Sequence, residues 1–192
     1  MRIFDTKIIL ASKSPRRKQL LEEAGFTFEI KTKEVDESFD SSMDVTAVAQ
    51  HLAERKAMAC ADFLSNKNEV VLAADSTVVM GDKIYNKPID SADAFRMLTE
   101  LSGHMHTVYT GVCLLSKDKK QTFKGASRVW FEDLSTEEKH WYIDKFSPFD
   151  KAGSYGVQEW LGHCKIAKIE GTYANIMGLP VDLVYKNLLN FM

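Results

Sequence analysis

The run Val70–Val79 is the most β-like segment of this chain and constrains its fold more than any other. Its first five residues, Val70–Ala74, are all apolar, and Asp75 follows them directly. An apolar run of this kind is typical of a strand that is buried within an α/β sheet. The segment therefore predicts a buried strand.

Strands and helices are predicted to alternate irregularly along the rest of the chain. The other expected strands are Ile8–Ala11, a strand near Phe26–Lys31, Ile84-Tyr85, a hairpin of Val108–Leu115 with Gln121–Glu132, and Cys164–Ile169. The expected helices are Pro15–Ala24, a long helix from a Ser42 or Asp44 cap to about Phe63, one from Asp90 or Ser91 to Gly103, one opened by the capping box at Ser135 and ending near Lys145, and one beginning at Pro180. This order predicts an α/β fold with a mixed, twisted sheet flanked by helices.

Length and composition limit the class of protein. A chain of 192 residues without a Pro/Gly-rich linker is expected to form a single domain over residues 1–192, or two closely associated lobes. The net charge of −2 creates no general attraction for nucleic acid, so no stable nucleic-acid complex is expected. Three separated cysteines without a C-x-x-C pair suit a reducing cytoplasm. No apolar stretch approaches the roughly 20 residues that cross a bilayer, so no membrane association is expected.

The connection between the first strand and the first helix, residues 12–17, carries cations in an unusual place. Ser14 is a favourable N-cap for the helix. Because a helix N-terminus carries about half a positive charge, Arg16 and Arg17 in its first turn are unfavourable unless an anion binds there. Together with the Ser12 hydroxyl and the backbone N–H groups, they predict a site for a phosphate chain.

Two further residues stand out on the predicted buried elements. Lys56 falls within the apolar face of the long helix, where a lysine either meets an anion or extends to water, and both interpretations stay open. Asp75 is interpreted as lying at the carboxyl end of its strand, where open α/β sheets place ligands. There it is suited to binding Mg²⁺ or activating water, with the Ser76 hydroxyl beside it; the alternative is a carboxylate that caps a turn.

Other segments give weaker signals. Lys87, before Pro88, is suited to contacting phosphate, although such a lysine is usually part of a surface loop. The acidic loop with Glu37 offers metal ligands, although a solvated loop is the simpler interpretation. In the cluster 150–158, Tyr155 offers a stacking surface and Gln158 a donor and an acceptor for a nucleobase edge. A tight turn explains that cluster equally well.

The P-loop motif for phosphate binding and a common serine-nucleophile motif are absent from the sequence. It contains no G-x-x-x-x-G-K-[ST] and no G-x-S-x-G. The remaining functional groups are carboxylates, lysines, arginines and hydroxyls. This set favours metal-assisted hydrolysis of a phosphoanhydride over covalent catalysis.

In combination, these segments resemble the Maf family of nucleoside triphosphate pyrophosphatases. The matching motifs are Ser12-Lys13-Ser14-Pro15-Arg16-Arg17 with Leu20-Leu21, Ala74-Asp75-Ser76, Lys87-Pro88, Leu101-Ser102-Gly103 with Thr110-Gly111-Val112, and Asp150-Lys151-Ala152-Gly153 with Gln158. Each motif is weak alone, but their order from residue 8 to Pro180 covers nearly the whole chain.

The resemblance implies an α/β fold of the Maf and inosine-triphosphate-pyrophosphatase type, with a cleft between two lobes. It implies hydrolysis of a nucleoside triphosphate to a monophosphate and pyrophosphate with Mg²⁺ or Mn²⁺. Asp75 matches the proposed general base of the family, and Glu37 matches an acidic position of its phosphate site. Our hypothesis is that Asp75 and Glu37 hold the metal ion. The positions that match its phosphate site are Ser12, Arg16, Arg17, Lys56 and Lys87.

The branch within the family is also indicated. Arg16, the hydroxyl of Ser76 and Gln158 resemble the branch that acts on dTTP and UTP, although that branch usually has Thr in place of Ser76. The same reaction on modified nucleotides is one alternative. Another is a non-catalytic nucleotide-binding regulator of septum formation. The oligomeric state stays open, with a homodimer as one option.

Overall fold

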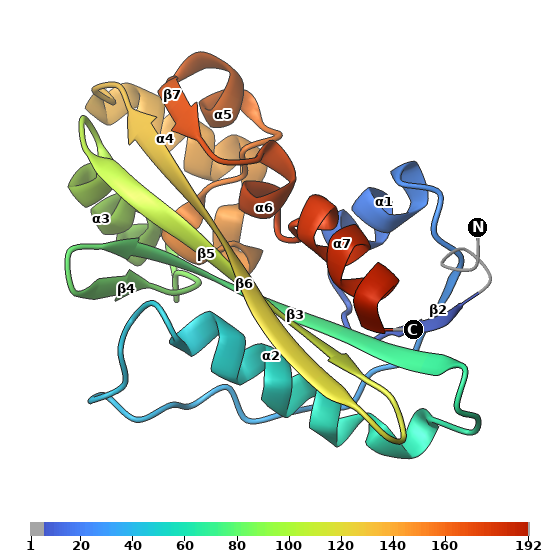
Figure 1. Ribbon diagram of the computed structural model, residues 1–192. Coiled ribbons are helices and arrows are strands. Elements are labelled where there is room, and N and C mark those ends of the chain that lie inside the picture. Colours follow the sequence, from blue (N-terminus) through green and yellow to red (C-terminus); the bar gives the residue numbers. More distant parts are fainter. Residues whose placement is uncertain (1–5, 192) are drawn as a thin grey trace. The chain divides into compact units, whose positions relative to one another are not determined.

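The computed structural model describes residues 6–191 (Figure 1). The strands are β1 (Lys7–Leu10), β2 (Phe28–Ile30), β3 (Glu69–Met80), β4 (Lys83–Tyr85), β5 (Met105–Leu115), β6 (Lys120–Phe131) and β7 (Ile166–Glu170). The α-helices are α1 (Pro15–Glu23), α2 (Val48–Ala59), α3 (Ser91–Leu101), α4 (Thr136–Phe146), α5 (Trp160–Cys164), α6 (Tyr173–Met177) and α7 (Val181–Phe191). Short 3₁₀ helices are η2 (Ala61–Phe63), η3 (Pro148–Asp150) and η4 (Ala152–Ser154).

The strands form a mixed sheet, as the sequence predicts. Their hydrogen-bonded order is β2-β1-β3-β5-β6-β7, and β4 pairs with β3 outside this order. Strand β1 runs parallel to both β2 and β3, whereas β4 is antiparallel to β3 and β7 is antiparallel to β6. No helix in residues 6–191 is both long and apolar enough to span a bilayer.

The described residues form two compact units. The first unit comprises residues 6–75, 110–125 and 178–191, and the second comprises residues 76–109 and 126–177. Each of the long strands β3, β5 and β6 contributes residues to both units.

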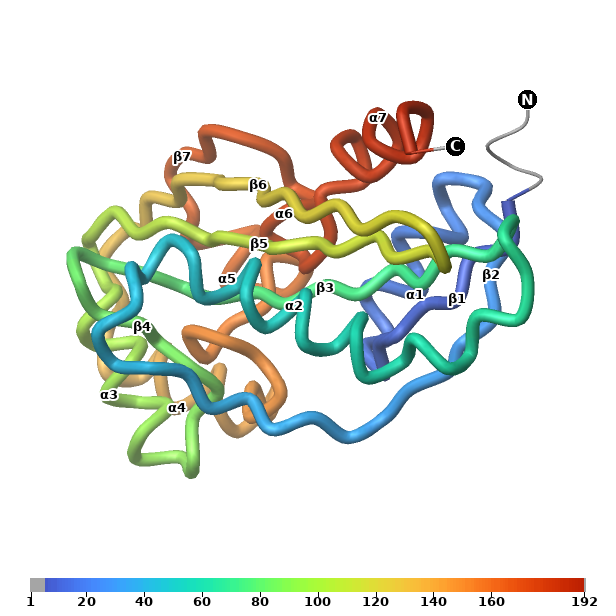
Figure 2. The backbone as a smooth tube through the Cα atoms, turned by 60° about the horizontal axis from the view of Figure 1, so that its bottom comes forward, coloured from blue at the N-terminus to red at the C-terminus, as the bar shows by residue number. Residues whose placement is uncertain are grey.

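In the first unit, α2 packs on the sheet through small side chains. Ala53 and Ala57 are fully buried in one core with Ile9 of β1 and Val71 of β3. Figure 2 shows the helix following a long irregular segment, residues 31–47, that comes from β2. Small residues let the helix approach the strands closely, and this approach fixes where the polar side chains of α2 lie.

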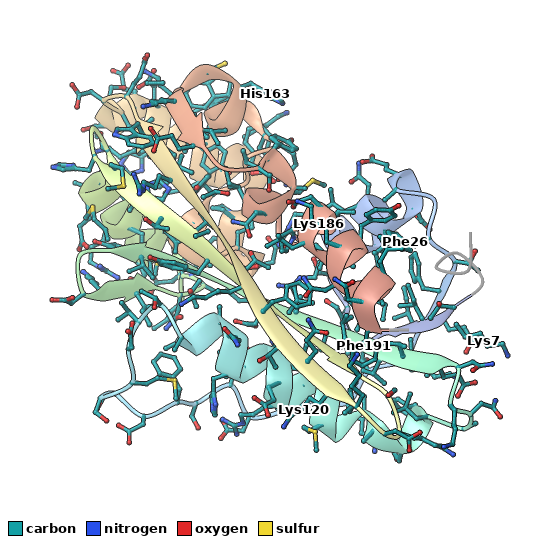
Figure 3. The ribbon with its side chains drawn as sticks, viewed as in Figure 1. Lys7, Phe26, Lys120, His163, Lys186 and Phe191 are labelled. Carbon is teal, nitrogen blue, oxygen red and sulfur yellow. The ribbon has the colours of Figure 1, made fainter. Side chains whose placement is uncertain are left out.

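The last helix, α7, also belongs to the first unit and is held at its C-terminal end. Lys119 Nζ donates to the carbonyl oxygens of Asn190 and Phe191, at 3.0 and 3.3 Å, where a helix leaves its carbonyls without intrahelical partners. Figure 3 labels Phe191 on this helix and Lys120, the residue after Lys119, at the start of β6. Gly178, the first residue of the loop before α7, takes part in the candidate site described below.

The second unit has its own core beneath α3 and α4. Leu98 and Leu101 of α3 pack with Tyr142 of α4 and with Val108 and Val129 of the sheet. Helix α3 begins with the predicted cap, Asp90, which accepts from the backbone N–H of Asp93. Helix α4 begins with the predicted capping box.

Several predicted boundaries are corrected by the structure. Helix α2 begins at Val48, because the Asp44 side chain accepts from the Thr46 backbone N–H in a turn before the helix. The expected strand Cys164–Ile169 is in part the end of helix α5, and β7 begins at Ile166. Both short helices α5 and α6 are missed, because a five-residue helix shows too little periodicity.

Candidate active site

The phosphate-site prediction at residues 12–17 is centred on Arg17. Its Nε donates to the Gly178 carbonyl at 2.8 Å and its Nη1 donates to the Ser12 hydroxyl at 3.2 Å. The same hydroxyl accepts from the Ser14 backbone N–H, also at 3.2 Å. The guanidinium group is therefore held in a fixed orientation at the start of α1.

The start of α1 and its N-cap residue, Ser14, are as predicted. Ser14 has the extended backbone of an N-cap residue, yet its side chain makes no capping hydrogen bond, and the first turn holds no acidic residue. Arg16 is half-buried in that turn. The pKa of Arg17 is lowered, mainly because the side chain is buried. The negative charges of Asp75 and Glu37 oppose this shift, whereas the positive charge of Arg16 adds to it. This combination of positive helix end and arginines is suited to an anion.

Asp75 lies inside β3, which corrects the prediction that it ends a strand. Strand β3 continues to Met80, and pairs with β1 through residues 69–72 and with β4 through residues 78–80. Asp75 lies between these two pairings, three positions beyond Leu72, which pairs with the last residue of β1, Leu10. The Asp75 carboxylate thus lies beyond the carboxyl end of β1. It does not lie at the carboxyl end of its own strand, β3.

Lys56 of α2 contacts both acidic residues of the predicted site. Its Nζ lies 2.5 Å from Asp75 Oδ1 and 2.7 Å from Glu37 Oε1. The side chains of Lys56 and Asp75 are 18% and 13% exposed, whereas that of Glu37 is 49% exposed. Of the two interpretations of Lys56, the contact with an anion is the one observed, and Glu37 is part of an ion-pair cluster.

Two carboxylates that converge on one cation also form a donor set for a divalent metal ion. Mg²⁺ is bound in many sites by one or two carboxylates, with water and substrate phosphates completing its ligands. No group of three or more His, Cys, Asp or Glu side chains in residues 6–191 forms a closed metal site. Asp75 and Glu37 are the acidic residues of this cluster that could hold such an ion.

The second unit contains Ser76, Lys87 and Gln158. Ser76 is half-buried in β3, and Lys87 is exposed in the loop after β4. The backbone N–H of Gly153 donates to the carbonyl of Asn86 at 3.2 Å, which joins the Lys87 loop to the glycine-containing segment. Because a Cβ at Gly153 would lie 2.9 Å from Val78 Cγ2, only glycine allows this packing.

Gln158 lies just before α5, between η4 and that helix. Its Nε2 donates to Glu159 Oε1 at 3.5 Å. Its Oε1 is buried and accepts no hydrogen bond within the described chain. The prediction that Tyr155 offers a stacking surface is wrong: the ring is 5% exposed and packs edge-on against His106 and Phe131.

Sequence reasoning missed the residues that support Gln158. Glu159 contacts Lys151 Nζ at 3.0 Å and accepts from the hydroxyl of Tyr142, which also accepts from the Gly156 backbone N–H at 3.0 Å. Tyr142 comes from α4, and no pattern in the sequence connects that helix to residues 156–159. Lys151 and Glu159 lie within or next to the cluster that the sequence singles out, but their pairing is not predicted by it.

Comparisons with curated sequences and with a family model agree with the resemblance. A curated dTTP/UTP pyrophosphatase of Parabacteroides distasonis is 41% identical over 186 residues, which cover 96% of each chain. Another from Thermosipho africanus is 47% identical over 179 residues, covering 93% of this chain and 90% of the relative. The Ham1 protein of Staphylococcus aureus, a solved structure, aligns with 66% of this chain and 72% of its own, at a TM-score of 0.49 and 17% identity. Because the family model described as Maf-like protein also matches residues 7–191, this chain belongs to the Maf family.

Proposed function

We propose that this chain hydrolyses dTTP and UTP to the nucleoside monophosphate and pyrophosphate. The observation that carries the proposal is the cluster in which Lys56 contacts Asp75 and Glu37 while Arg17 lies within their electrostatic influence. The names of the two relatives described above support the choice of substrates. Hydrolysis breaks the bond between the α-phosphorus and the oxygen that leaves with pyrophosphate.

The cationic residues account for binding of the triphosphate. The guanidinium group of Arg17 is oriented by Ser12 and Gly178, and such planar donors match phosphate oxygens. Arg16 adds charge in the same helical turn. We assign Lys56 and Lys87 to the same role, in which fixed positive charges stabilise the charge that develops on the leaving pyrophosphate.

Asp75 and Glu37 are the residues that would hold Mg²⁺ or Mn²⁺. A bound divalent cation neutralises phosphate charge and makes a water molecule more acidic. The alternative role of Asp75 is that of the general base, which accepts a proton from the attacking water. A tight metal ligand is not easily a free base as well, so the two roles compete. Lys56 keeps this carboxylate oriented through its contact with Oδ1.

Ser76 and Gln158 are assigned to the nucleoside. Gln158 has a buried amide oxygen that can accept from a base, and Ser76 offers a hydroxyl next to Asp75. Serine has one methyl group fewer than threonine, so we expect a weaker apolar contact with the substrate at this position and broader selectivity.

The reaction is proposed to take place in the cytoplasm. All three cysteines, Cys60, Cys113 and Cys164, are free thiols, which is compatible with a reducing compartment. A nucleoside triphosphate is the proposed partner, and a homodimer remains one option for the assembly.

Pyrophosphate release from a panel of nucleoside triphosphates tests the proposed function. Purified protein with Mg²⁺ is offered dTTP, UTP, CTP, GTP, ATP and modified nucleotides at equal concentration. We expect dTTP and UTP to be turned over fastest and the activity to disappear when EDTA removes the metal. Tight binding without turnover would instead favour a nucleotide-binding regulator.

A further inference from the structure

The two polar atoms of the Gln158 carboxamide have different surroundings. Nε2 donates to Glu159 Oε1, whereas Oε1 is buried without a donor from the described residues. A buried acceptor without a donor costs free energy, which a ligand N–H group can recover. The oxygen is therefore the atom of this side chain that is poised to bind a ligand donor.

The Glu159 carboxylate that faces Nε2 is itself held on both oxygens. Lys151 Nζ lies 3.0 Å from Oε1, and the hydroxyl of Tyr142 donates to Oε2. The side chains of Lys151 and Glu159 are only 9% and 14% exposed. Because α4 supplies Tyr142 and residues 151–159 supply the other groups, the carboxylate has little freedom to turn away from Gln158.

This arrangement selects one orientation of the Gln158 amide. An ionised carboxylate only accepts hydrogen bonds, so it favours the amide nitrogen as its neighbour. The reverse orientation would place the amide oxygen against Glu159 Oε1, and two acceptors in a buried position repel each other. Gln158 thus presents an acceptor to its ligand.

We propose that Glu159 is a positioning residue that fixes Gln158 Oε1 as the acceptor for the N3–H group of uracil and thymine. This inference rests on the proposed function, in which Gln158 contacts the base. Cytosine has an unprotonated N3 at the same place in the ring, so its lone pair would face a second acceptor. The 5-methyl group that distinguishes thymine from uracil is remote from N3, and both bases are accepted.

Burial makes this discrimination strong. A site whose buried polar group is matched by one ligand and left unpaired by another separates the two by far more than a site in water. Because the Oε1 atom is buried, a hydrogen bond to it forms out of contact with water.

Gly156 provides an independent way to disturb the same pair. A Cβ at this position would lie 2.7 Å from Gln158 Nε2 and 2.8 Å from Glu159 Cδ. Gly156→Ala therefore displaces both side chains without removing the Glu159 charge. Glu159→Gln does the reverse: it keeps the shape but adds an N–H₂ group, which stabilises either orientation of Gln158.

The test measures binding of the α,β-imido analogues of UTP and CTP by calorimetry, in the presence of Mg²⁺. We expect the wild-type chain to favour the UTP analogue by at least about 100-fold. Both Glu159→Gln and Gly156→Ala should reduce this preference by about tenfold or more, the factor that corresponds to one hydrogen bond. Glu138→Gln is the matched control, since Glu138 belongs to the capping box of α4 and pairs with Lys165 at 2.7 Å. It should keep the wild-type preference.

The outcomes separate this inference from the proposed function. A wild-type preference that falls in the two variants supports the inference even if UTP is not hydrolysed, and that failure would contradict only the proposed function. A wild-type chain that binds both analogues equally, or neither, overturns the inference. So does an unchanged preference in folded Glu159→Gln protein; if a thermal melt shows that this variant is unfolded, Gly156→Ala decides alone.

Discussion

Lys56 Nζ lies 2.5 Å from Asp75 Oδ1, although the two residues come from different elements, α2 and β3. The same ammonium group lies 2.7 Å from Glu37 Oε1 in the long segment before α2. One lysine on an otherwise buried helix face thus brings two carboxylates together. This contact turns three separate residues into a cluster that is suited to a metal ion and a phosphate chain.

Replacing Asp75 with asparagine should remove most of the activity while the fold is kept. The amide cannot accept the proton of the attacking water, and it binds a divalent cation poorly. We expect kcat for UTP to fall by about 100- to 10 000-fold, the range typical of a general base. Asp62→Asn is the control: Asp62 pairs with Lys33 at the surface, and its loss should leave turnover unchanged. Near-wild-type turnover by Asp75→Asn would disprove the assigned role.

Arg17→Lys should weaken substrate binding even though the positive charge is retained. The planar guanidinium group of Arg17 contacts the Gly178 carbonyl and the Ser12 hydroxyl through different nitrogen atoms. The single ammonium nitrogen of a lysine cannot reproduce both contacts while it also binds a phosphate. We expect kcat/KM to fall by at least about tenfold, equivalent to the loss of one charge-assisted hydrogen bond. Arg96→Lys, in the surface network with Asp93 and Glu100, should leave kcat/KM unchanged. Equal kinetics for the two variants would exclude Arg17 from the phosphate site.

Gly111→Ala should destabilise the first unit. A Cβ at Gly111 would lie 2.3 Å from both the N and the Cα of Gln50, so α2 would have to move away from β5. We expect the free energy of unfolding in urea to fall by about 3 kcal/mol or more, the upper range for overpacked positions. Gly81→Asn offers a comparison, because Gly81 has a φ of +59° and open space around an added Cβ. Its cost should stay below about 1 kcal/mol, since asparagine tolerates this conformation. A similar loss in both variants would contradict the close approach.

His106 should make stability depend on pH. Burial lowers its pKa to about 3, and its Nε2 pairs with the Tyr155 hydroxyl at 2.8 Å. An unfolded histidine binds a proton near pH 6.5, so between about pH 6.5 and about pH 3 only the unfolded state gains the proton. The free energy of unfolding therefore has its full contribution from neutral His106 above about pH 6.5. As the pH is lowered through this window, the free energy of unfolding decreases by up to about 1.4 kcal/mol per pH unit. In urea melts at several pH values, His106→Gln should reduce this slope. An unchanged slope in His106→Gln would show that the imidazole is protonated in the folded state.

Local patterns in the sequence predict much of the fold. Apolar runs identify β3 and the hairpin of β5 and β6, and capping residues locate the starts of α3 and α4. These signals depend on neighbouring residues, which is why they are visible in the sequence. The start of α2 is misjudged because Asp44 satisfies a backbone N–H group in a turn, and the short helices α5 and α6 lack enough residues to show a period.

The residues of the candidate site were likewise predicted only in part from the sequence. The arginines at the start of α1 already indicate an anion, because the helix end makes their positions unfavourable otherwise. Residue patterns leave Lys56 and Glu37 ambiguous, and the family resemblance assigns them to the site. Tyr155 is predicted to face a ligand, but its ring fills the core beside His106 and Phe131.

The sequence by itself determined the α/β class, the start of helix α1 and the inventory of charged groups, since propensity, capping and charge act over a few residues. Only the tertiary structure decided that Lys56 meets Asp75 and Glu37 and that Tyr142 supports Glu159 beside Gln158. These contacts join residues from separate elements. The contacts of Lys56 exist because packing of small side chains such as Ala53 and Ala57 brings α2 close to the sheet, a result that no local pattern contains.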